Sequence, residues 1–277
     1  MTKRWFITGV SRGLGLSLAK AALARGDLVV GTVRAGKPPI DAAPDKLHVL
    51  TLDVTDGQAV ARTVDEAFRL AGGRLDVVVN NAGYGLLGAV EDATDEDLQR
   101  LFATDVFGPF KVIRAALPKL RAQGDARILN ITSIAGRAPG AGSGLYAAAK
   151  FALEGLTAAL AQEVGPLGVK LTAVAPGAFR TDFLSSHSIQ KSARRAEGYD
   201  ATVGKATEAW SSMAGRQLGD PDRAALALLS IADAPEPPLH LLLGSDALKR
   251  ASAKLEAVEA EIEQWKSLTV STDFVEA

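Results

Sequence analysis

Tyr146 and Lys150 are the two residues of this sequence whose types and spacing best suit proton transfer. They are four positions apart in a segment with a helical pattern, so they should share one face of a helix. An isolated tyrosine has a pKa of about 10, and a nearby ammonium group lowers that pKa because it favours the phenolate. Tyr146 could then act as a general acid or base at a carbonyl or alcohol oxygen.

Ser133 is a candidate partner for Tyr146 because it follows an apolar run at residues 127–132. In open α/β sheets the carboxyl ends of the strands face the ligand crevice, where a hydroxyl group can stabilise charge that develops on a substrate oxygen. A serine that only ends a strand is the structural alternative.

A glycine-rich loop at residues 8–15 follows the first apolar run and precedes a helical pattern. Its G-x-x-x-G-x-G spacing lets the backbone turn tightly and approach a ligand closely. The N-terminus of the following helix offers free N–H groups and a positive dipole end to a pyrophosphate. The loop is therefore predicted to bind a dinucleotide through Gly9, Ser11, Arg12, Gly13, Leu14 and Gly15.

The charges near this loop favour NADP over NAD as the dinucleotide. The second expected strand ends at Arg34, where NAD-binding folds usually carry a carboxylate for the ribose hydroxyls. Arg34 could instead bind a 2′-phosphate, and Arg12 could meet the same phosphate from the other side. Each arginine alone is typical of a solvated surface, but the pair without the acidic residue predicts NADP.

Two further strand ends carry polar or small residues. Asp53 and Val54 follow the third expected strand, where the carboxylate could accept a hydrogen bond from an adenine amino group or belong only to a turn. Asn81, Ala82 and Gly83 follow the fourth strand, where small residues would let the chain pass beneath a cofactor. A plain structural turn is the alternative for this motif as well.

Short apolar runs alternate with helical patterns over the first 180 residues. This alternation predicts an α/β fold, a doubly wound parallel sheet with helices on both faces, and one domain over residues 1–277. Residues 182–218 have weak periodicity, and we interpret them as a mobile insertion over the cofactor crevice. Residues 246–267 have a helical pattern with Leu248, Leu255 and Ile262 on one side, which favours a surface helix on the core over a dimerisation helix.

Composition narrows the classes of partner and site. The net charge is −1 and basic residues do not cluster on one expected helix, which argues against nucleic-acid and membrane partners. The absence of cysteine excludes disulfides and thiolate metal sites. His48, His187 and His240 lack ligand spacing, so we expect no metal site. Without a signal-peptide pattern or a long apolar run, the expected location is the cytoplasm.

Together these motifs resemble the classical short-chain dehydrogenase/reductase family, over about residues 3–182. The resemblance implies a seven-stranded Rossmann sheet, NAD(P) binding, a Ser-Tyr-Lys centre with a proton relay through water, and commonly a homodimer or homotetramer. Segments 80–88, 90–91 and 179–183 resemble a bacterial branch related to steroid- and retinol-type dehydrogenases. By the same resemblance, Lys150 contacts the nicotinamide ribose beside Tyr146. The residues that would border the nicotinamide carboxamide are Pro176, Gly177 and Thr181.

Asp105 departs from the family pattern, which usually has asparagine between threonine and Val-Phe-Gly. In the family the backbone carbonyl at this position holds the relay water, so Asp105 could still serve the same role. An ionised Asp105 near Lys150 would favour the protonated lysine and alter the pH profile. A misaligned position, with Asp105 bonded only to helix backbone, is the alternative.

The predicted function is an NADP-dependent oxidoreductase that transfers a hydride between nicotinamide and a carbonyl or alcohol, with Tyr146 as general acid/base. One alternative is a catalytically impaired NADP-binding regulatory protein, for which Asp105 is the only support. Another is a lyase or epimerase on the same scaffold. Apolar residues of the insertion favour a small hydrophobic substrate, namely Phe183, Leu184, Ile189, Tyr199, Trp210 and Met213.

Overall fold

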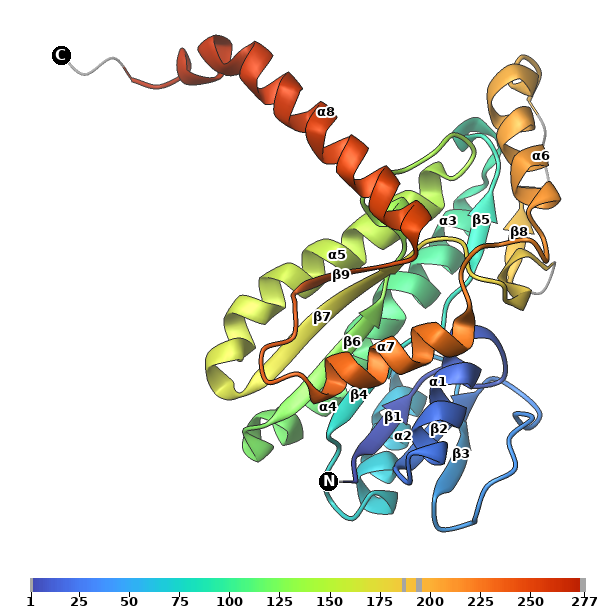
Figure 1. The fold of residues 1–277 in the computed structure, drawn as a ribbon, viewed down its shortest axis with the longest axis vertical. Coiled ribbons are helices and arrows are strands. Elements are labelled where there is room, and N and C mark those ends of the chain that lie inside the picture. Colours follow the sequence, from blue (N-terminus) through green and yellow to red (C-terminus); the bar gives the residue numbers. More distant parts are fainter. Residues whose placement is uncertain (1, 186–187, 193–195, 275–277) are drawn as a thin grey trace.

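The main sheet has seven strands, all parallel, in the order β3-β2-β1-β4-β6-β7-β9 (Figure 1). The structure is a computed structural model that describes residues 2–185, 188–192 and 196–274. The strands of this sheet are β1 (Arg4–Ile7), β2 (Leu28–Val33), β3 (Leu47–Thr51), β4 (Val77–Asn80), β6 (Ala126–Ile131), β7 (Val169–Pro176) and β9 (His240–Leu243).

Helices cover both faces of this sheet (Figure 1). Phe6 of β1 packs into one apolar cluster with α2, α4 and α5, whereas its neighbours Trp5 and Ile7 pack into a second cluster with α1 and α7. This alternation follows from the two-residue period of a strand. The helices are α1 (Gly13–Ala24), α2 (Gly57–Leu70), α3 (Asp95–Phe102), α4 (Gly108–Gln123), α5 (Gly144–Val164), α6 (Lys205–Ser212), α7 (Pro221–Asp233) and α8 (Ser245–Val270).

The strand order reverses direction at β1, which lies between β2 and β4. Such a reversal opens a crevice at the carboxyl ends of the strands, where ligands of doubly wound sheets bind. The doubly wound, parallel Rossmann sheet agrees with the sequence prediction. The glycine-rich loop leads into the start of α1.

The insertion at residues 182–218 contains regular structure that its sequence did not indicate. Strand β8 (Ile189–Lys191) pairs in parallel with β5 (Gly85–Leu87) and forms a second, two-stranded sheet. The Tyr199 hydroxyl donates a hydrogen bond to Glu91 at 2.9 Å, and α6 follows. Three-residue strands have no detectable period, and their pairing depends on a segment far away in the chain, so local patterning missed them.

Helix α8 does not lie on the core as the sequence analysis expected. Figure 1 shows it leaving the body of the molecule from its first turns. Ala247 and Ala251 are buried, but Leu255 is 69% exposed and Ile262 is 64% exposed. The expectation was wrong beyond the base of the helix because the body offers no surface beneath the rest of it. Among the described helices, none, α8 included, is both long and apolar enough to cross a bilayer.

Candidate active site

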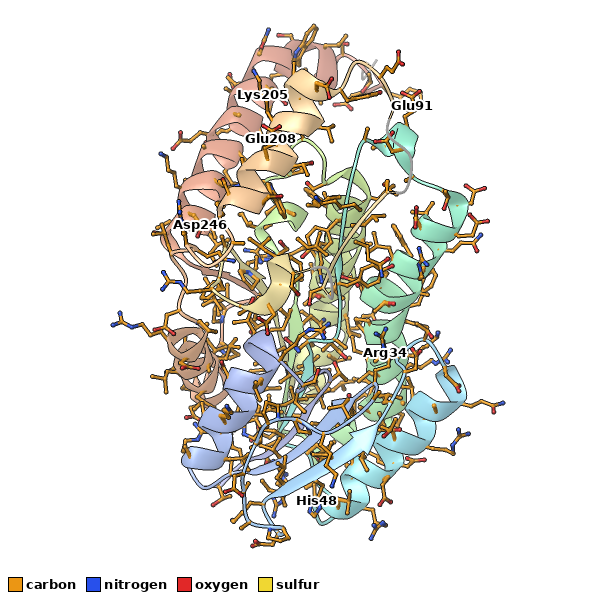
Figure 2. All side chains as sticks on the ribbon, turned by 90° about the vertical axis from the view of Figure 1, so that its right-hand side faces the viewer. Arg34, His48, Glu91, Lys205, Glu208 and Asp246 are labelled. Carbon is orange, nitrogen blue, oxygen red and sulfur yellow. The ribbon has the colours of Figure 1, made fainter. Side chains whose placement is uncertain are left out.

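A cavity of about 880 Å³ lies at the carboxyl ends of the central strands. Figure 2 shows Arg34, directly after β2, to the right of the centre of the view and Asp246, at the base of α8, to its left, and both line this cavity. Gly15 and Asp105 are the two predicted site residues that do not line it. Those that do are Gly9, Ser11, Arg12, Gly13, Leu14, Arg34, Asp53, Val54, Asn81, Ala82, Gly83, Ser133, Tyr146, Lys150, Pro176, Gly177 and Thr181.

The glycine-rich loop is held against the end of β4 by Asn81. The Asn81 side-chain amide donates hydrogen bonds to the carbonyl oxygens of Thr8 and Gly9, each at 2.9 Å. A Cβ added at Gly15 would lie 2.3 Å from that amide nitrogen, and one at Gly9 would lie 3.1 Å from Ala82 Cα. Gly9 also has a φ of +76°, which disfavours side chains. The loop therefore needs glycine at both positions to stay closely packed.

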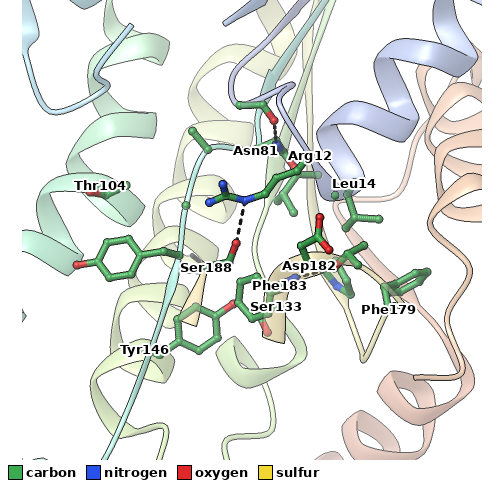
Figure 3. A pocket seen from close by; sticks show the side chains of 18 of the residues that line it. Arg12, Leu14, Asn81, Thr104, Ser133, Tyr146, Phe179, Asp182, Phe183 and Ser188 are labelled. Atoms are coloured by element: carbon green, nitrogen blue, oxygen red, sulfur yellow. Dashed lines mark hydrogen bonds between the residues drawn. The ribbon is translucent and has the colours of Figure 1, made fainter. Parts of the chain in front are cut away.

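The two arginines expected at a 2′-phosphate both line the cavity. In this structure Arg12 Nε donates a hydrogen bond to the Ser188 hydroxyl at 3.0 Å, so the loop contacts the insertion (Figure 3). Arg34 is exposed at the end of β2. Asp53 accepts hydrogen bonds from the N–H and hydroxyl groups of Thr55, at 2.9 and 2.7 Å, so it belongs to a turn while also lining the cavity.

Ser133, Tyr146 and Lys150 come together at the base of the cavity. Tyr146 and Lys150 lie one turn apart on α5, with the Lys150 ammonium 5.6 Å from the Tyr146 ring centre. Lys150 donates a hydrogen bond to the Ile131 carbonyl at 3.2 Å. A Cβ at Gly136 would lie 2.9 Å from the Lys150 backbone, so the turn after Ser133 packs directly on α5. Figure 3 shows Ser133 beside Tyr146 as a result.

The protonation of Tyr146 differs from the sequence-based expectation. Burial raises the pKa of Tyr146, since only 4% of the residue is exposed, and Asp105 raises the pKa further. Lys150 and the Ser133 hydrogen bond oppose this shift without overcoming it. Sequence spacing showed the lysine next to the phenol but not the low-polarity surroundings, which stabilise the neutral phenol.

Asp105 is paired with Lys150 and not merely with helix backbone. It is buried in a π-turn (Ala103–Phe107) between α3 and α4, with Oδ2 3.0 Å from Lys150 Nζ, while Oδ1 accepts a hydrogen bond from the Tyr84 N–H. Burial alone would lower the pKa of Lys150, but Asp105, Tyr146 and Glu154 together raise it. Burial also raises the pKa of Asp105, against the lowering by Lys150, so the two groups titrate as one buried pair, and the raised pKa of Lys150 favours its ammonium form.

The expected substrate-lining residues of the insertion divide into two groups. Phe183, Leu184, Trp210 and Met213 line the cavity, so this part of the expectation agrees with the structure. Ile189 is instead a buried residue of β8, and the Tyr199 hydroxyl pairs with Glu91, so neither lines the cavity.

Three cavity residues near the end of the chain were missed. Gln217 is 3% exposed, and its amide atoms have no hydrogen-bond partner among the described residues. Asp246 accepts a hydrogen bond from the Ala178 N–H at 2.8 Å, and Arg250 donates one to the Ala138 carbonyl. These contacts join residues at least 68 positions apart, and nothing in the local sequence pattern indicates them.

The histidines do not form a common site in the structure. His48 and His240 lie on β3 and β9, the two opposite edges of the main sheet, and His187 lies outside the described residues. In residues 2–185, 188–192 and 196–274, no group of three or more potential metal ligands comes together.

Comparison with known proteins gives matches over most of the chain. The family model for short chain dehydrogenases matches residues 3–192. An oxidoreductase of Botryotinia fuckeliana is 38% identical over 276 residues, which cover 98% of this chain and 100% of that protein. The crystal structure of a short-chain dehydrogenase from Streptomyces avermitilis has a TM-score of 0.92 at 39% identity and covers 99% of this chain and 100% of its own. ElxO with NADP bound has a TM-score of 0.75 at 27% identity, over 90% and 100% of the two chains.

Proposed function

This chain belongs to the short-chain dehydrogenase family, and from that premise we propose that it is an NADP-dependent oxidoreductase acting between a carbonyl and an alcohol. The observation that carries this proposal is the buried pair of Tyr146 and Lys150, which opens with Ser133 into the cavity that the glycine-rich loop also lines. The same residues oppose the alternative of a non-catalytic NADP-binding protein, whose only support is Asp105.

The residues around the glycine-rich loop fit a dinucleotide. The closely packed glycines keep side chains away from the N-terminus of α1, where N–H groups and the helix dipole favour a pyrophosphate. Arg34 and Arg12 hold the 2′-phosphate in this proposal, and Arg12 exchanges its bond to Ser188 for the phosphate. Pro176, Gly177 and Thr181 border the carboxamide of the nicotinamide. ElxO, which was solved with NADP bound, supports this choice of cofactor.

The catalytic roles follow from where the three side chains lie. When bound, the cofactor would supply the hydride as NADPH for carbonyl reduction or accept it as NADP⁺ for alcohol oxidation. Ser133 donates a hydrogen bond to the substrate oxygen, and Tyr146 transfers its proton to that oxygen during carbonyl reduction, or removes a proton during alcohol oxidation. The Lys150 ammonium stabilises the phenolate that forms, and it contacts the nicotinamide ribose.

The substrate class follows from the cavity lining. Phe183 lies beside Tyr146, with their ring centres 6.1 Å apart, and Leu184, Trp210 and Met213 add apolar surface to the same cavity. Apolar walls with a few convergent polar groups suit a small hydrophobic ketone or alcohol. Ser133 and Tyr146 would be the polar groups that orient its oxygen.

Binding of NADPH and NADH to the wild type and to Arg34→Ala tests the proposal. Loss of a charge-assisted contact to the 2′-phosphate should weaken NADPH binding by about 10- to 100-fold and leave NADH binding unchanged. Nicotinamide fluorescence measures both dissociation constants. Arg62→Ala, at an exposed position of α2, is the matched control and should bind both nucleotides as the wild type does.

Two results would contradict parts of this proposal separately. Equal affinity of the wild type for NADPH and NADH would remove the role of Arg34 in cofactor choice. Failure of the wild type to bind either nucleotide would overturn the dehydrogenase function itself.

A further inference from the structure

Helix α8 exposes a stripe of large apolar side chains outside the body of the molecule (Figure 1). Leu255 and Trp265 are 69% and 57% exposed, and Ile262 lies between them with a similar exposure. Val258 completes the stripe and is half-buried. We name these four residues the α8 stripe. An uncovered apolar surface of this kind marks an interaction site.

The spacing of the α8 stripe is that of a coiled coil. Leu255 and Ile262 are seven residues apart, as are Val258 and Trp265, which gives alternating steps of three and four. This spacing corresponds to the a and d positions of two heptads. Ala251 precedes the stripe on the same side and is buried against the body with Ile134 and Ala138. The side of α8 that packs on the body at its base thus continues, uncovered, along the rest of the helix.

The charged residues beside the stripe indicate its partner. Lys254 and Glu261 occupy g positions, and Glu259 and Lys266 occupy e positions. In a parallel pair of α8 helices in register, each Lys254 faces Glu259 of the partner subunit, and each Glu261 faces Lys266 of the partner subunit. All four e–g contacts of such a pair therefore join opposite charges.

Other arrangements of α8 match these charges less well. In an antiparallel pair, Leu255 can pack against Val258 of the partner subunit. Lys254 then faces Glu261 of the partner subunit, but Glu259 faces the uncharged Ser252 of the partner subunit. A membrane surface would select a polar face rich in lysine and arginine. The polar face of α8 instead mixes the basic residues with glutamates, namely Glu256, Glu259, Glu261 and Glu263.

We propose that two copies of this chain associate through α8, as a short parallel coiled coil in which the two α8 stripes pack on each other. Lys266 contacts Glu263 of its own helix at 3.2 Å. Because this ion pair is exposed, it contributes little to stability, so Lys266 can give it up for Glu261 of the partner subunit at little cost. The proposal does not depend on the catalytic function, because its evidence lies entirely on α8.

Cysteine cross-linking tests the parallel register directly. The chain has no cysteine, so one introduced cysteine is its only thiol. Ile262→Cys places two thiols at the same a layer of a parallel pair, and mild oxidation should give a disulfide-linked dimer. Ala260→Cys, on the opposite side of α8, is the matched control and should remain unlinked. Absence of linkage in Ile262→Cys, or equal linkage in both variants, would overturn the proposal.

Solution mass provides a second, independent measurement. Ile262→Glu should weaken association at least about tenfold in analytical ultracentrifugation, because it buries a charge in the stripe. Its melting temperature should change only through this loss of association, because Ile262 makes no contact with the core clusters. If the wild type is larger than a dimer, the variant should lose one level of assembly. A wild type that is a single copy at every concentration, or a variant with unchanged mass, would contradict the proposal.

Charge exchange separates the proposed pairing from a general effect of mutation. Glu259→Lys would face Lys254 of the partner subunit and should weaken association several-fold. Adding Lys254→Glu to that variant restores opposite charges and should restore the association. If the double variant associates no better than Glu259→Lys alone, the parallel e–g pairing is wrong.

Discussion

Asp105 is the single residue that most changes the chemistry expected of this site. Its carboxylate lies 3.0 Å from the Lys150 ammonium in a fully buried environment, where removing one partner of a pair leaves the other charge uncompensated. The same carboxylate raises the pKa of Tyr146, although burial of the phenol contributes more. Asp105 therefore influences the proton donor through charge rather than by contact with the substrate.

Asp105→Asn should move the pH dependence of the reaction to lower pH. Without the carboxylate the pKa of Tyr146 falls, so the rise of alcohol oxidation with pH should occur earlier. The fall of carbonyl reduction with rising pH should shift in the same direction. Rate against pH for kcat/KM with the wild type and variant measures this effect. Glu91→Gln, at an exposed position of the turn Val90–Asp92 that contacts Tyr199 of the insertion, is the control.

An unmoved pH profile in Asp105→Asn would show that Asp105 does not act on Tyr146.

The sequence identified Ser133, Tyr146 and Lys150 because helical spacing and strand ends are local features. It did not predict the direction of the Tyr146 pKa shift, since burial depends on the packing of remote segments. Gln217 and Arg250 were missed for the same reason.

The strands and helices of the main sheet could be predicted because each carries its own pattern. Continuous apolar runs marked β1 and β4, and capping residues such as Thr94, which accepts a hydrogen bond from the Asp97 N–H, marked helix starts. The pairing of β5 with β8 has no such local signal. The outward direction of α8 was also unpredictable, because an amphipathic pattern does not say whether a helix meets its own core or another chain.

Gly15→Ala should disrupt the contact between the glycine-rich loop and β4. The added Cβ would lie 2.3 Å from the Asn81 amide nitrogen and from the Gly9 carbonyl, so the loop must shift. We expect a loss of about 1–3 kcal/mol in the free energy of unfolding, measured by denaturant titration, together with weaker NADPH binding.

Gly155→Ala is the matched control for this substitution. Gly155 lies within α5, and a Cβ there meets nothing within 4 Å. Alanine at this position should raise the free energy of unfolding by about 0.5–1 kcal/mol, because it lowers the backbone entropy of the unfolded chain. Equal effects of the two alanines on stability would show that the close approach at Gly15 is not limiting.

At the scale of the whole molecule, an apolar cluster packs on each face of the main sheet. The insertion is joined to the rest of the molecule by the smaller sheet of β5 and β8. Strands β6 and β7 of the main sheet share six residue pairs, whereas β5 and β8 share three and have no further strand beside them. The Gly85 N–H donates to the Ser188 carbonyl, and the Ser192 N–H donates to the Leu87 carbonyl. Stability should therefore be unevenly distributed across the molecule.

Hydrogen exchange of backbone amides should reveal this difference. The amides of Gly85 and Ser192 should exchange faster than those of β6, since the small sheet can open while both apolar clusters remain intact. Mass spectrometry of peptides from the two regions measures the rates. Equal protection of both regions would mean that the small sheet opens only when the whole molecule unfolds.

The small sheet also has a consequence for the order in which the chain folds. The Ala196 N–H bonds to the Asp92 carboxylate across 104 positions of sequence, next to the β5–β8 pair. Closing so long a loop costs conformational entropy, and three residue pairs do not offset this cost by themselves. The small sheet should therefore form only after the main-sheet strands that lie between β5 and β8 in the sequence have paired. The main-sheet strands β1, β2, β3, β4, β6 and β7 would thus come together first, and the insertion would pack over the crevice in one of the last folding steps.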